Sequence, residues 1–430
     1  MVVQRIVRVM TMSLALAAPT ASALAQVSAP PGSPPPMVMS GPLGISAARD
    51  GSGTSWLPDD TVTLGTTRMR GPWMLMLHGH AFVQEIATTG DRGHHEFGSV
   101  NWVMGMAEHP LWGGPLTLRT MLSAEPLTVG RCGYPDLLQT GEACRGAVLH
   151  DQQHPHDLFM EVAADYRHAL TTALAVELYG GPSGEPALGP TAFPHRPSAM
   201  ADPTAPIAHH WLDSTHVSFG VVTAGLYGRR WKTEASAFNG REPDDKRYGF
   251  DLAPLDSYAG RVWWLPSARW AMQLSAGHLH DVAVGATGVP ESATRVTASV
   301  TYHRVRTGPG SSATTIAWGQ NREAGGTTQA LLAETTVDLT AANQVFARGE
   351  LMQKSAADLA LGPTLAGIFP IAKLQVGYTR LLPKRGGVRP GLGGSVGIGF
   401  LPASLGETYG TRHPLEFSLF LALRPSGRAK

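Results

Sequence analysis

The feature that most restricts the fold of this chain is a repeated alternation of apolar and polar side chains. In the stretch HDQQHPHDLFMEVAADY, from His150 to Tyr166, apolar side chains occupy every second position from Leu158 onward, and the intervening positions include Asp157, Glu161 and Asp165. A period of two is the period of a β-strand, so the two sets lie on opposite faces. In a soluble sheet the apolar face is the core, whereas in an outer-membrane barrel it meets lipid and the charged face lines the lumen.

Similar runs follow one another from Trp73 to the C-terminus, and most have about 9 to 13 residues, close to the length of a tilted membrane strand. We expect strands at about 73–86, 97–107, 116–126, 156–168, 172–181, 215–228, 231–240, 257–265, 269–280, 293–306, 312–322, 329–339, 343–353, 369–382, 391–401 and 414–424. The connections alternate in length. Short ones include 169–171, 229–230, 266–268, 307–311 and 340–342; long ones include 87–96, 127–155, 182–214, 241–256, 281–292, 354–368 and 402–413.

Short turns at one end and long loops at the other are typical of bacterial outer-membrane barrels. A β-sandwich does not impose this alternation. The sequence therefore predicts an all-β fold, a transmembrane antiparallel β-barrel of about 16 strands (about 14 to 18) with long outer loops. We assign residues 73–430 to the barrel. Residues 26–72, which are rich in Pro and Gly, are expected to be a periplasmic lead-in or a plug segment.

The N-terminus has the form of a secretory signal peptide at residues 1–25. Arg5 and Arg8 precede an apolar segment at 9–18, and Ala23 and Ala25 provide the small residues of a cleavage site. After it, no stretch approaches the roughly 18 apolar residues of a membrane helix. Removal of the two arginines changes the formal charge from +1 to −1. That value excludes a global basic field, so nucleic acid is not an expected partner.

The parity of the expected strands predicts which charged side chains face the lumen. The charged side chains expected to face the lumen are Asp157, Glu161, Asp165, Arg167, Glu177, Lys232, Glu234, Arg295, Glu334, Asp338, Arg348, Glu350, Lys373 and Glu416. Because both signs occur, we expect a polar, cross-bridged interior, as in a narrow or partly plugged channel. Seven tryptophans near strand ends are expected to form an aromatic girdle: Trp102, Trp112, Trp211, Trp231, Trp263, Trp264 and Trp270.

Histidines are concentrated in the two longest expected outer loops and close to carboxylates. The candidate metal ligands are His150, His154, His156, Asp157, His209, His210, Asp213 and His216. Imidazole suits Cu, Zn or Ni, and a carboxylate can orient the second ring nitrogen. The spacing HxxxHxH is not a fixed zinc pattern, and histidines in polar loops also serve structural roles. Histidines in polar loops are more often solvated or hydrogen-bonded to the backbone, so a structural role is the first interpretation, and a transition-metal site for Cu or Zn is the functional alternative.

The only two cysteines, Cys132 and Cys144, lie close together in a polar stretch of the first long loop. In an oxidising compartment a disulfide is expected, worth about 3 kcal/mol in the chain-entropy model. Free thiols or metal ligands are the alternative.

Enzyme signatures are weak. The GxSxG match at 393–397 lies inside a glycine-rich strand instead of a strand–turn–helix, and the neighbouring Asp213, Ser214 and His216 cannot form a triad within a single strand. A composition of only 16% charged residues and 50 glycines also fits strands and turns better than a helical enzyme.

Four long motifs carry a resemblance to a known family: HDQQHPHDLFMEVAADY, GEPALGPTAFPHRPSAM, PIAHHWLDSTH and FNGREPDDKRYGFD. With them the chain resembles a family of exported, β-barrel-like outer-membrane proteins of Gram-negative bacteria, from about Gly41 to the C-terminus. The genes of that family often lie near metal-resistance and multicopper-oxidase genes, which favours the metal interpretation. The resemblance implies no particular activity and no residue roles.

These observations together predict a porin-like channel of the Gram-negative outer membrane that binds or passes a transition metal such as copper. The expected partners are outer-membrane lipid, the barrel-assembly machinery, a small solute or metal ion, and two further copies in a homotrimer, since trimers are common among barrels of this size. Two alternatives stay open, an outer-membrane hydrolase and a structural or adhesive surface barrel without transport.

Overall fold

The computed structural model describes residues 41–130, 132–284, 290–305, 310–362 and 364–427. The expected signal peptide at 1–25 and the first part of the lead-in segment lie outside these described residues. None of the helices in the described part of the chain is long and apolar enough to cross a membrane.

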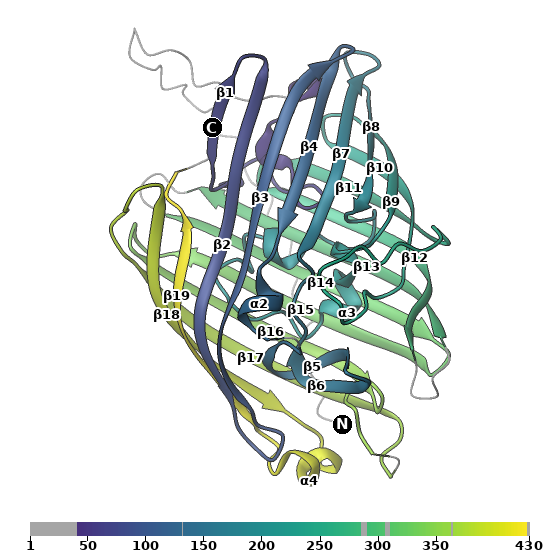
Figure 1. Cartoon of the computed structure of the whole chain (residues 1–430), viewed down its shortest axis with the longest axis vertical. Coiled ribbons are helices and arrows are strands. Elements are labelled where there is room, and N and C mark those ends of the chain that lie inside the picture. Colours follow the sequence, from purple (N-terminus) through teal and green to yellow (C-terminus); the bar gives the residue numbers. More distant parts are fainter. Residues whose placement is uncertain (1–40, 131, 285–289, 306–309, 363, 428–430) are drawn as a thin grey trace, which may run out of the picture. The chain divides into compact units, whose positions relative to one another are not determined.

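The described chain is built around a closed, antiparallel barrel of 16 strands (Figure 1). Its strands are β2 (Trp73–Thr88), β3 (His95–Leu111), β4 (Gly114–Leu122), β7 (Phe159–Ala169), β8 (Ala175–Ser183), β9 (Val221–Tyr227), β10 (Trp231–Phe238), β11 (Ser257–Ser267), β12 (Trp270–Val284), β13 (Pro290–Val305), β14 (Ser311–Glu323), β15 (Gly326–Asp338), β16 (Asn343–Ser355), β17 (Ile368–Leu381), β18 (Val388–Phe400) and β19 (Leu415–Pro425). Pairing of β19 with β2, from Glu416 opposite Thr88 to Leu423 opposite Ala81, closes the sheet. The predicted fold class is confirmed.

A short extra strand covers the part of β2 that β19 does not reach. This strand, β1 (Thr66–Arg70), pairs with β2 from Trp73 to Leu77. The Gly65 amide donates a hydrogen bond to the Gly427 carbonyl, 3.2 Å away, so β1 continues the line of the C-terminal strand. Without β1, this length of β2 would expose unpaired backbone groups.

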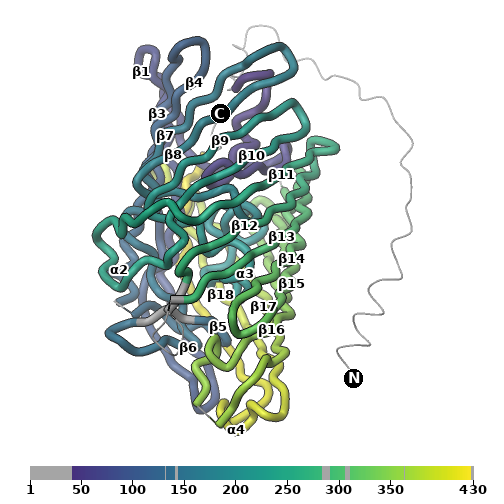
Figure 2. Tube along the Cα trace, turned by 90° about the vertical axis from the view of Figure 1, so that its right-hand side faces the viewer, coloured from purple at the N-terminus to yellow at the C-terminus, as the bar shows by residue number. Residues whose placement is uncertain are grey.

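The strands alternate between a buried inner face and an exposed outer face. In β10 Lys232 and Glu234 are buried, whereas Trp231 on the same strand is exposed. The outer face of other strands carries large apolar side chains, among them Leu274 on β12 and Leu374 on β17, at 58% and 53% exposure. An apolar outer wall around a polar interior is the arrangement of a membrane-spanning barrel. Figure 2 shows the strands lying side by side around one axis.

The expected aromatic girdle is only partly correct. The exposed tryptophans are Trp112, Trp231, Trp264 and Trp270. Trp211 and Trp263 are buried inside, where their indole N–H groups donate to Thr328 Oγ1 at 2.8 Å and to Glu234 Oε1 at 3.0 Å. Trp102 is half-buried and packs edge-on against the ring of His78. A tryptophan that has a polar partner inside the barrel is better placed there than in lipid.

The long connections contain structure of their own. The expected loop at 127–155 forms a hairpin of β5 (Tyr134–Cys144) and β6 (Ala147–Gln153), and the expected loop at 281–292 is mostly absorbed into β12 and β13. The remaining described helices are single turns: α2 (Glu125–Thr128), α3 (His209–Leu212), α4 (Gly406–Tyr409), η1 (Pro42–Gly44), η2 (Ala47–Arg49), η3 (Phe193–His195), η4 (Ser214–His216) and η5 (Ala403–Leu405).

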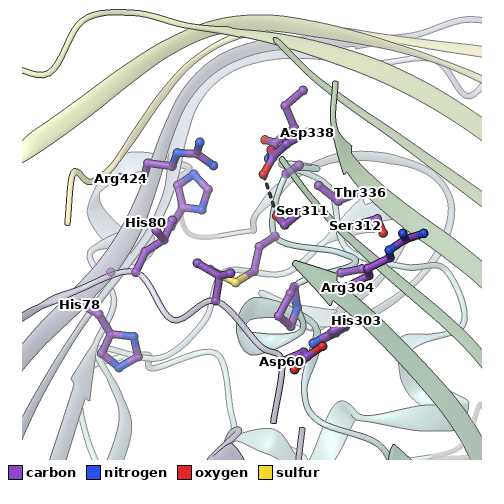
Figure 3. Close-up of a pocket in the computed structure, with 18 of the residues that line it drawn as sticks. Asp60, His78, His80, His303, Arg304, Ser311, Ser312, Thr336, Asp338 and Arg424 are labelled. Atoms are coloured by element: carbon purple, nitrogen blue, oxygen red, sulfur yellow. Dashed lines mark hydrogen bonds between the residues drawn. The ribbon is translucent and has the colours of Figure 1, made fainter. Parts of the chain in front are cut away.

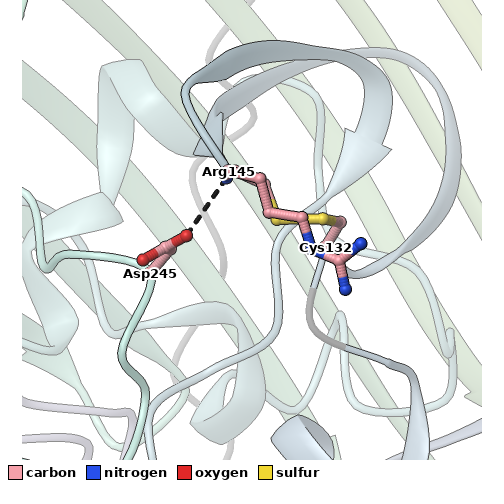
Figure 4. Close-up of a disulfide and its surroundings, with 4 residues drawn as sticks. Cys132, Arg145 and Asp245 are labelled. Atoms are coloured by element: carbon pink, nitrogen blue, oxygen red, sulfur yellow. Dashed lines mark hydrogen bonds between the residues drawn. A yellow bond between two sulfur atoms is a disulfide. The ribbon is translucent and has the colours of Figure 1, made fainter.

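The expected disulfide between Cys132 and Cys144 is present at the end of β5 (Figure 4). It joins a residue just before β5 to the last residue of β5, across 12 residues of sequence, at the turn into β6. Just beyond it, the Arg145 amide donates to a carboxylate oxygen of Asp245, 3.1 Å away in the β10–β11 connection. The disulfide therefore holds a hairpin that also contacts a second outer loop.

Much of three described segments lies inside the barrel: residues 41–65, residues 123–130 and 132–158, and residues 184–220. Figure 1 shows α2, α3, β5 and β6 within the outline of the barrel. A mixed core joins Leu138 of β5, Trp211 of α3 and wall residues such as Leu332 and Ile371. These segments are held by side chains of the wall and define the remaining cavities.

Candidate functional site

The wall contacts the N-terminal segment through buried charges on β7 to β11. Arg167 lies 3.0 Å from Asp50, 2.7 Å from Asp165 and 2.9 Å from Glu177. Lys232 lies 2.5 Å from Glu177 and also donates to the carbonyl of Thr54. These expected lumen charges thus pair with one another and with backbone or side chains of residues 41–65.

The opposite wall contacts the loop at 184–220 in the same way. Arg348 lies 3.3 Å from Glu334 and 3.2 Å from Asp202, a loop residue. Glu334 also forms an ion pair with the guanidinium of Arg196, a loop residue, at 2.5 Å. Glu350 accepts the backbone N–H of Ala208 at 2.9 Å. Because buried charges are stable only when paired, this loop and the wall form one unit.

The other expected lumen residues have interior partners too. Their contacts are Glu161 with Tyr179 at 2.7 Å, Glu234 with Arg261 at 2.8 Å, Arg295 with Ser214 at 2.9 Å, Lys373 with Asp136 at 2.7 Å, Glu416 with Lys373 at 3.0 Å and Asp338 with Gln344 at 2.7 Å. Arg119 and Arg261 also face inward, although the sequence analysis did not single them out. The alternation along the strand that selects Lys232 and Glu234 also predicts that each of the two arginines faces inward from its own strand.

Three of the expected metal ligands gather where the two longest loops meet. His156 precedes β7, His209 lies on α3 and His216 on η4. The Nε2 atoms of His156 and His216 are 3.0 Å apart, and the ring centres of His209 and His216 are 5.1 Å apart. The ring of Phe193 packs against the rings of all three at 5.2 to 5.8 Å. We call His156, His209 and His216 the histidine cluster.

Hydrogen bonds to Nδ1 fix the orientation of each ring in the histidine cluster. His216 Nδ1 donates to the Asp213 carbonyl at 2.8 Å, and His209 Nδ1 lies 2.8 Å from Asp213 Oδ1. His156 Nδ1 lies 2.9 Å from the carboxylate of Glu125. An acceptor at Nδ1 requires the proton there, so a neutral ring presents a lone pair at Nε2. Two lone pairs that face each other at 3.0 Å need a proton or a cation between them.

Burial determines the protonation of the cluster. It lowers the pKa of His209 to about 4 and that of His216 well below the usual value. Burial also acts to lower the pKa of His156, but the charge and hydrogen bond of Glu125 outweigh it and raise this pKa. Burial would raise the pKa of Asp213, yet Arg196 at 2.8 Å and His209 hold it below the ordinary range. Of the three rings, His156 is therefore the one that takes up a proton most readily.

The other expected metal ligands have other partners, and His150 is not among the residues at the cluster. His150 contacts Asp151 at 3.1 Å, beside Arg92, and His210 lies 3.3 Å from Glu242. The ring of His154 is 6.2 Å from that of His210, and Asp157 lies 3.2 Å from Arg247. Burial raises the pKa of Asp157 to about 6. Within the described ranges, no three His, Cys, Asp or Glu side chains form a ready metal-binding set.

Several contributors to the site were not expected from the sequence. Glu125, on α2, is 3% exposed and accepts from both the backbone and the ring of His156. His195 Nε2 lies 3.2 Å from the sulfur of Met121 on the wall. His78, His80 and His303 face the interior from β2 and β13. The strand parity predicts the inward direction of these last three, but their relation to the loops depends on the tertiary fold.

Cavities separate the inserted segments from the wall. One of about 30 Å³ is lined by the histidine cluster together with Arg241 and Glu242. A second, of about 40 Å³, is lined by His156, Glu125, Tyr134, His80 and Met200. A third, of about 120 Å³, is lined by His78, His80, His303, Asp60 and Asp338 (Figure 3). We call them the His216 cavity, the middle cavity and the His80 cavity.

Comparison with known proteins identifies the fold. No protein-family model matches the chain, and no curated protein matches its sequence. Among solved structures, the anion-selective porin of Comamonas acidovorans is 12% identical, with a TM-score of 0.51 over 82% of this chain and 99% of that chain. OmpF of Salmonella typhi, in complex with daunomycin, is 10% identical, with a TM-score of 0.53 over 84% and 100% of the two chains. The barrel fold is that of porins, in agreement with the outer-membrane location expected from the sequence.

Proposed function

We propose that this protein is a porin-like channel whose lumen is restricted by its own inserted segments. The observation that carries the proposal is a closed barrel, apolar outside and polar inside, that encloses a series of small cavities among charged and imidazole side chains. A polar interior in a lipid-facing wall serves the passage of polar solutes. Because buried ion pairs hold the inserted segments in place, the remaining space admits only small solutes.

Planar-bilayer recordings of the purified full-length barrel test this proposal. We expect discrete channels of low conductance in potassium chloride and slow entry of sugars into proteoliposomes. A matched variant, Arg167→Gln, removes the link to Asp50 and should raise the conductance, because it loosens residues 41–65. Absence of channels from both proteins would contradict transport and favour a structural or adhesive surface barrel.

We further propose that the histidine cluster binds a transition metal, Cu or Zn. Support comes from the facing Nε2 atoms of His156 and His216 and from the acceptors that orient their second nitrogens, which is how proteins prepare imidazole ligands. Neutral His209 and His216 suit a cation. The expected location of the family's genes near metal-resistance genes points the same way.

Isothermal titration with Zn²⁺ and Cu²⁺ tests metal binding apart from transport. The double variant His156→Gln, His216→Gln should lose metal binding at the histidine cluster, while His95→Gln, at a ring that is 83% exposed, should keep it. Equal affinities for all three proteins would remove the metal proposal and leave the channel proposal standing.

The hydrolase alternative finds little support at this site. His216 Nε2 faces His156 and not a hydroxyl, and Ser214 Oγ accepts a hydrogen bond from Arg295. A serine-directed activity probe that labels the protein would revive it. The homotrimer and the dependence on the barrel-assembly machinery stay predictions; the mass of the detergent-purified protein checks the first, and depletion of the machinery in cells checks the second.

A further inference from the structure

The three cavities adjoin one another through the interior of the barrel. The His216 cavity and the middle cavity share His156 in their walls, and the middle cavity and the His80 cavity share His80, Trp102 and Met200. The His216 cavity also borders residues 240–243 of an outer loop. At the other end, the His80 cavity borders Ser311 and Asp338, the terminal residues of β14 and β15 beside the short turns. The series therefore runs from the long-loop end to the short-turn end.

An imidazole lies at every step of this series. Figure 3 shows His78 and His80 on one side of the His80 cavity and His303 with Asp60 on the other. The Nε2 atoms of His78, His80 and His303 are buried, and none has a hydrogen-bond partner among the described residues. The contact of His303 Nδ1 with Thr61 Oγ1, at 2.7 Å, leaves Nε2 as its available nitrogen. Buried polar atoms without partners are rare in folded proteins and indicate a ligand or water.

The ligand types along the series are those that transition metals prefer. Met200 adds a thioether where the middle cavity meets the His80 cavity, next to His80. Imidazole with thioether favours a soft or borderline cation over Mg²⁺ or Ca²⁺, which take oxygen ligands. Asp60 and Asp338 contribute negative charge to the His80 cavity, and Arg424 faces it; Asp60 also pairs with Arg269 at 3.3 Å, and Arg304 borders the cavity but is exposed. The charges therefore nearly balance, and the imidazole and thioether lone pairs are what favour a cation.

We propose that this series is a relay for a transition-metal cation, in which His80 and Met200 provide a second binding step between the histidine cluster and the short-turn end of the barrel. The inference deepens the proposed channel and metal functions and rests on both. Conduction needs sites that bind strongly enough for entry and weakly enough for release. A complete set of three or four ligands would retain the ion. Incomplete sets, which are what the described residues provide, pass it on.

Metal flux into proteoliposomes that contain a Zn²⁺-sensitive dye tests the relay with the full-length barrel. His80→Gln, which keeps a polar side chain of similar size, should slow Zn²⁺ and Cu²⁺ entry at least tenfold more than it changes Mg²⁺ leakage or potassium chloride conductance. His95→Gln is the matched control and should behave as wild type. His303→Gln supplies a second, independent substitution on the opposite wall, with the heat-modifiable gel shift of the folded barrel checked for each variant.

The possible failures are distinguishable. Wild-type Zn²⁺ entry in both His80→Gln and His303→Gln overturns the relay and leaves the channel and the metal site intact. An equal fall in Mg²⁺ and Zn²⁺ entry also overturns it, because the substitution then acts by obstruction. Wild-type barrels that conduct potassium chloride but exclude Zn²⁺ overturn the relay without affecting the channel. Absence of all conductance overturns both.

Discussion

The Nε2 atoms of His156 and His216 face each other at 3.0 Å, although 60 residues separate them in the chain. Each ring is fixed from behind, His156 by the Glu125 carboxylate and His216 by the Asp213 carbonyl. The pair therefore holds either a proton or a cation between two oriented nitrogens. This contact joins the two longest outer loops, and it places the chemistry of the protein at their junction inside the barrel.

Glu125→Gln should weaken Zn²⁺ and Cu²⁺ binding by about 10- to 100-fold, the usual effect of losing a carboxylate that orients a metal-bound imidazole. The amide keeps the size of the side chain but removes the charge that raises the pKa of His156. Titration against a chromophoric chelator measures the change. Glu85→Gln, at a side chain that is 52% exposed, is the control, and an equal loss in both variants would show that Glu125 has no specific role.

Arg167→Gln should destabilise the barrel by about 3 to 5 kcal/mol, because it leaves buried carboxylates without their partner. Asp50, Asp165 and Glu177 all lie within 3.0 Å of this guanidinium. Urea unfolding in detergent gives the free energy, and limited proteolysis at residues 41–65 reports the release of the segment. The control is Arg230→Gln, which also removes one positive charge but lies on the exposed turn before β10. Similar protease patterns for the two variants would contradict the anchoring role of Arg167.

The stability of the folded chain should fall with rising pH through the ionisation of Glu185. Burial raises the pKa of this carboxyl group to about 8, and Arg261 at 3.7 Å offsets it only in part. The unfolded chain ionises Glu185 near pH 4.5, so the folded state binds the extra proton between about pH 4.5 and 8 and loses that advantage as the pH rises. Unfolding free energies at pH 5 and pH 9 should differ less in Glu185→Gln than in wild type. The exposed Glu407→Gln should keep the wild-type difference.

Replacement of both cysteines by serine should loosen the β5–β6 hairpin without opening the barrel. The 12-residue separation of Cys132 and Cys144 corresponds to about 3 kcal/mol of chain entropy. Hydrogen exchange should speed up in β5 and β6, whereas the barrel strands keep their protection and the protein its resistance to heat on gels. Loss of the heat-resistant band would mean that the disulfide supports the whole barrel.

Much of the wall could be predicted because its determinants are local. The expected strands correspond to the 16 barrel strands. The largest errors in their ends occur where the local sequence favours a helical turn over a strand. Pro126 favours the first turn of a helix, so the expected strand at 116–126 ends at Leu122 and α2 follows it. The expected strand at 215–228 begins only at Val221, because residues 214–216 form η4.

The contents of the barrel were much harder to predict. Parity assigns side chains to one face of a strand, but it does not say that Arg167 meets Asp50 or that Glu334 meets Arg196. Those contacts join positions more than 100 residues apart, and they depend on how the loops fold into the lumen. The β5–β6 hairpin was missed because its alternation is short and is interrupted by irregular pairing.

The sequence by itself determined the wall: the period of two assigns each side chain to lipid or lumen, and the alternating connection lengths give a closed barrel with loops at one end. The tertiary structure alone decided that three segments enter the lumen, that His156 and His216 meet, and that His80 and Met200 share two cavities. The physical reason is the sequence separation of the residues that interact. Alternation is a property of neighbouring residues, whereas a buried pair exists only after distant segments have closed around it and excluded water.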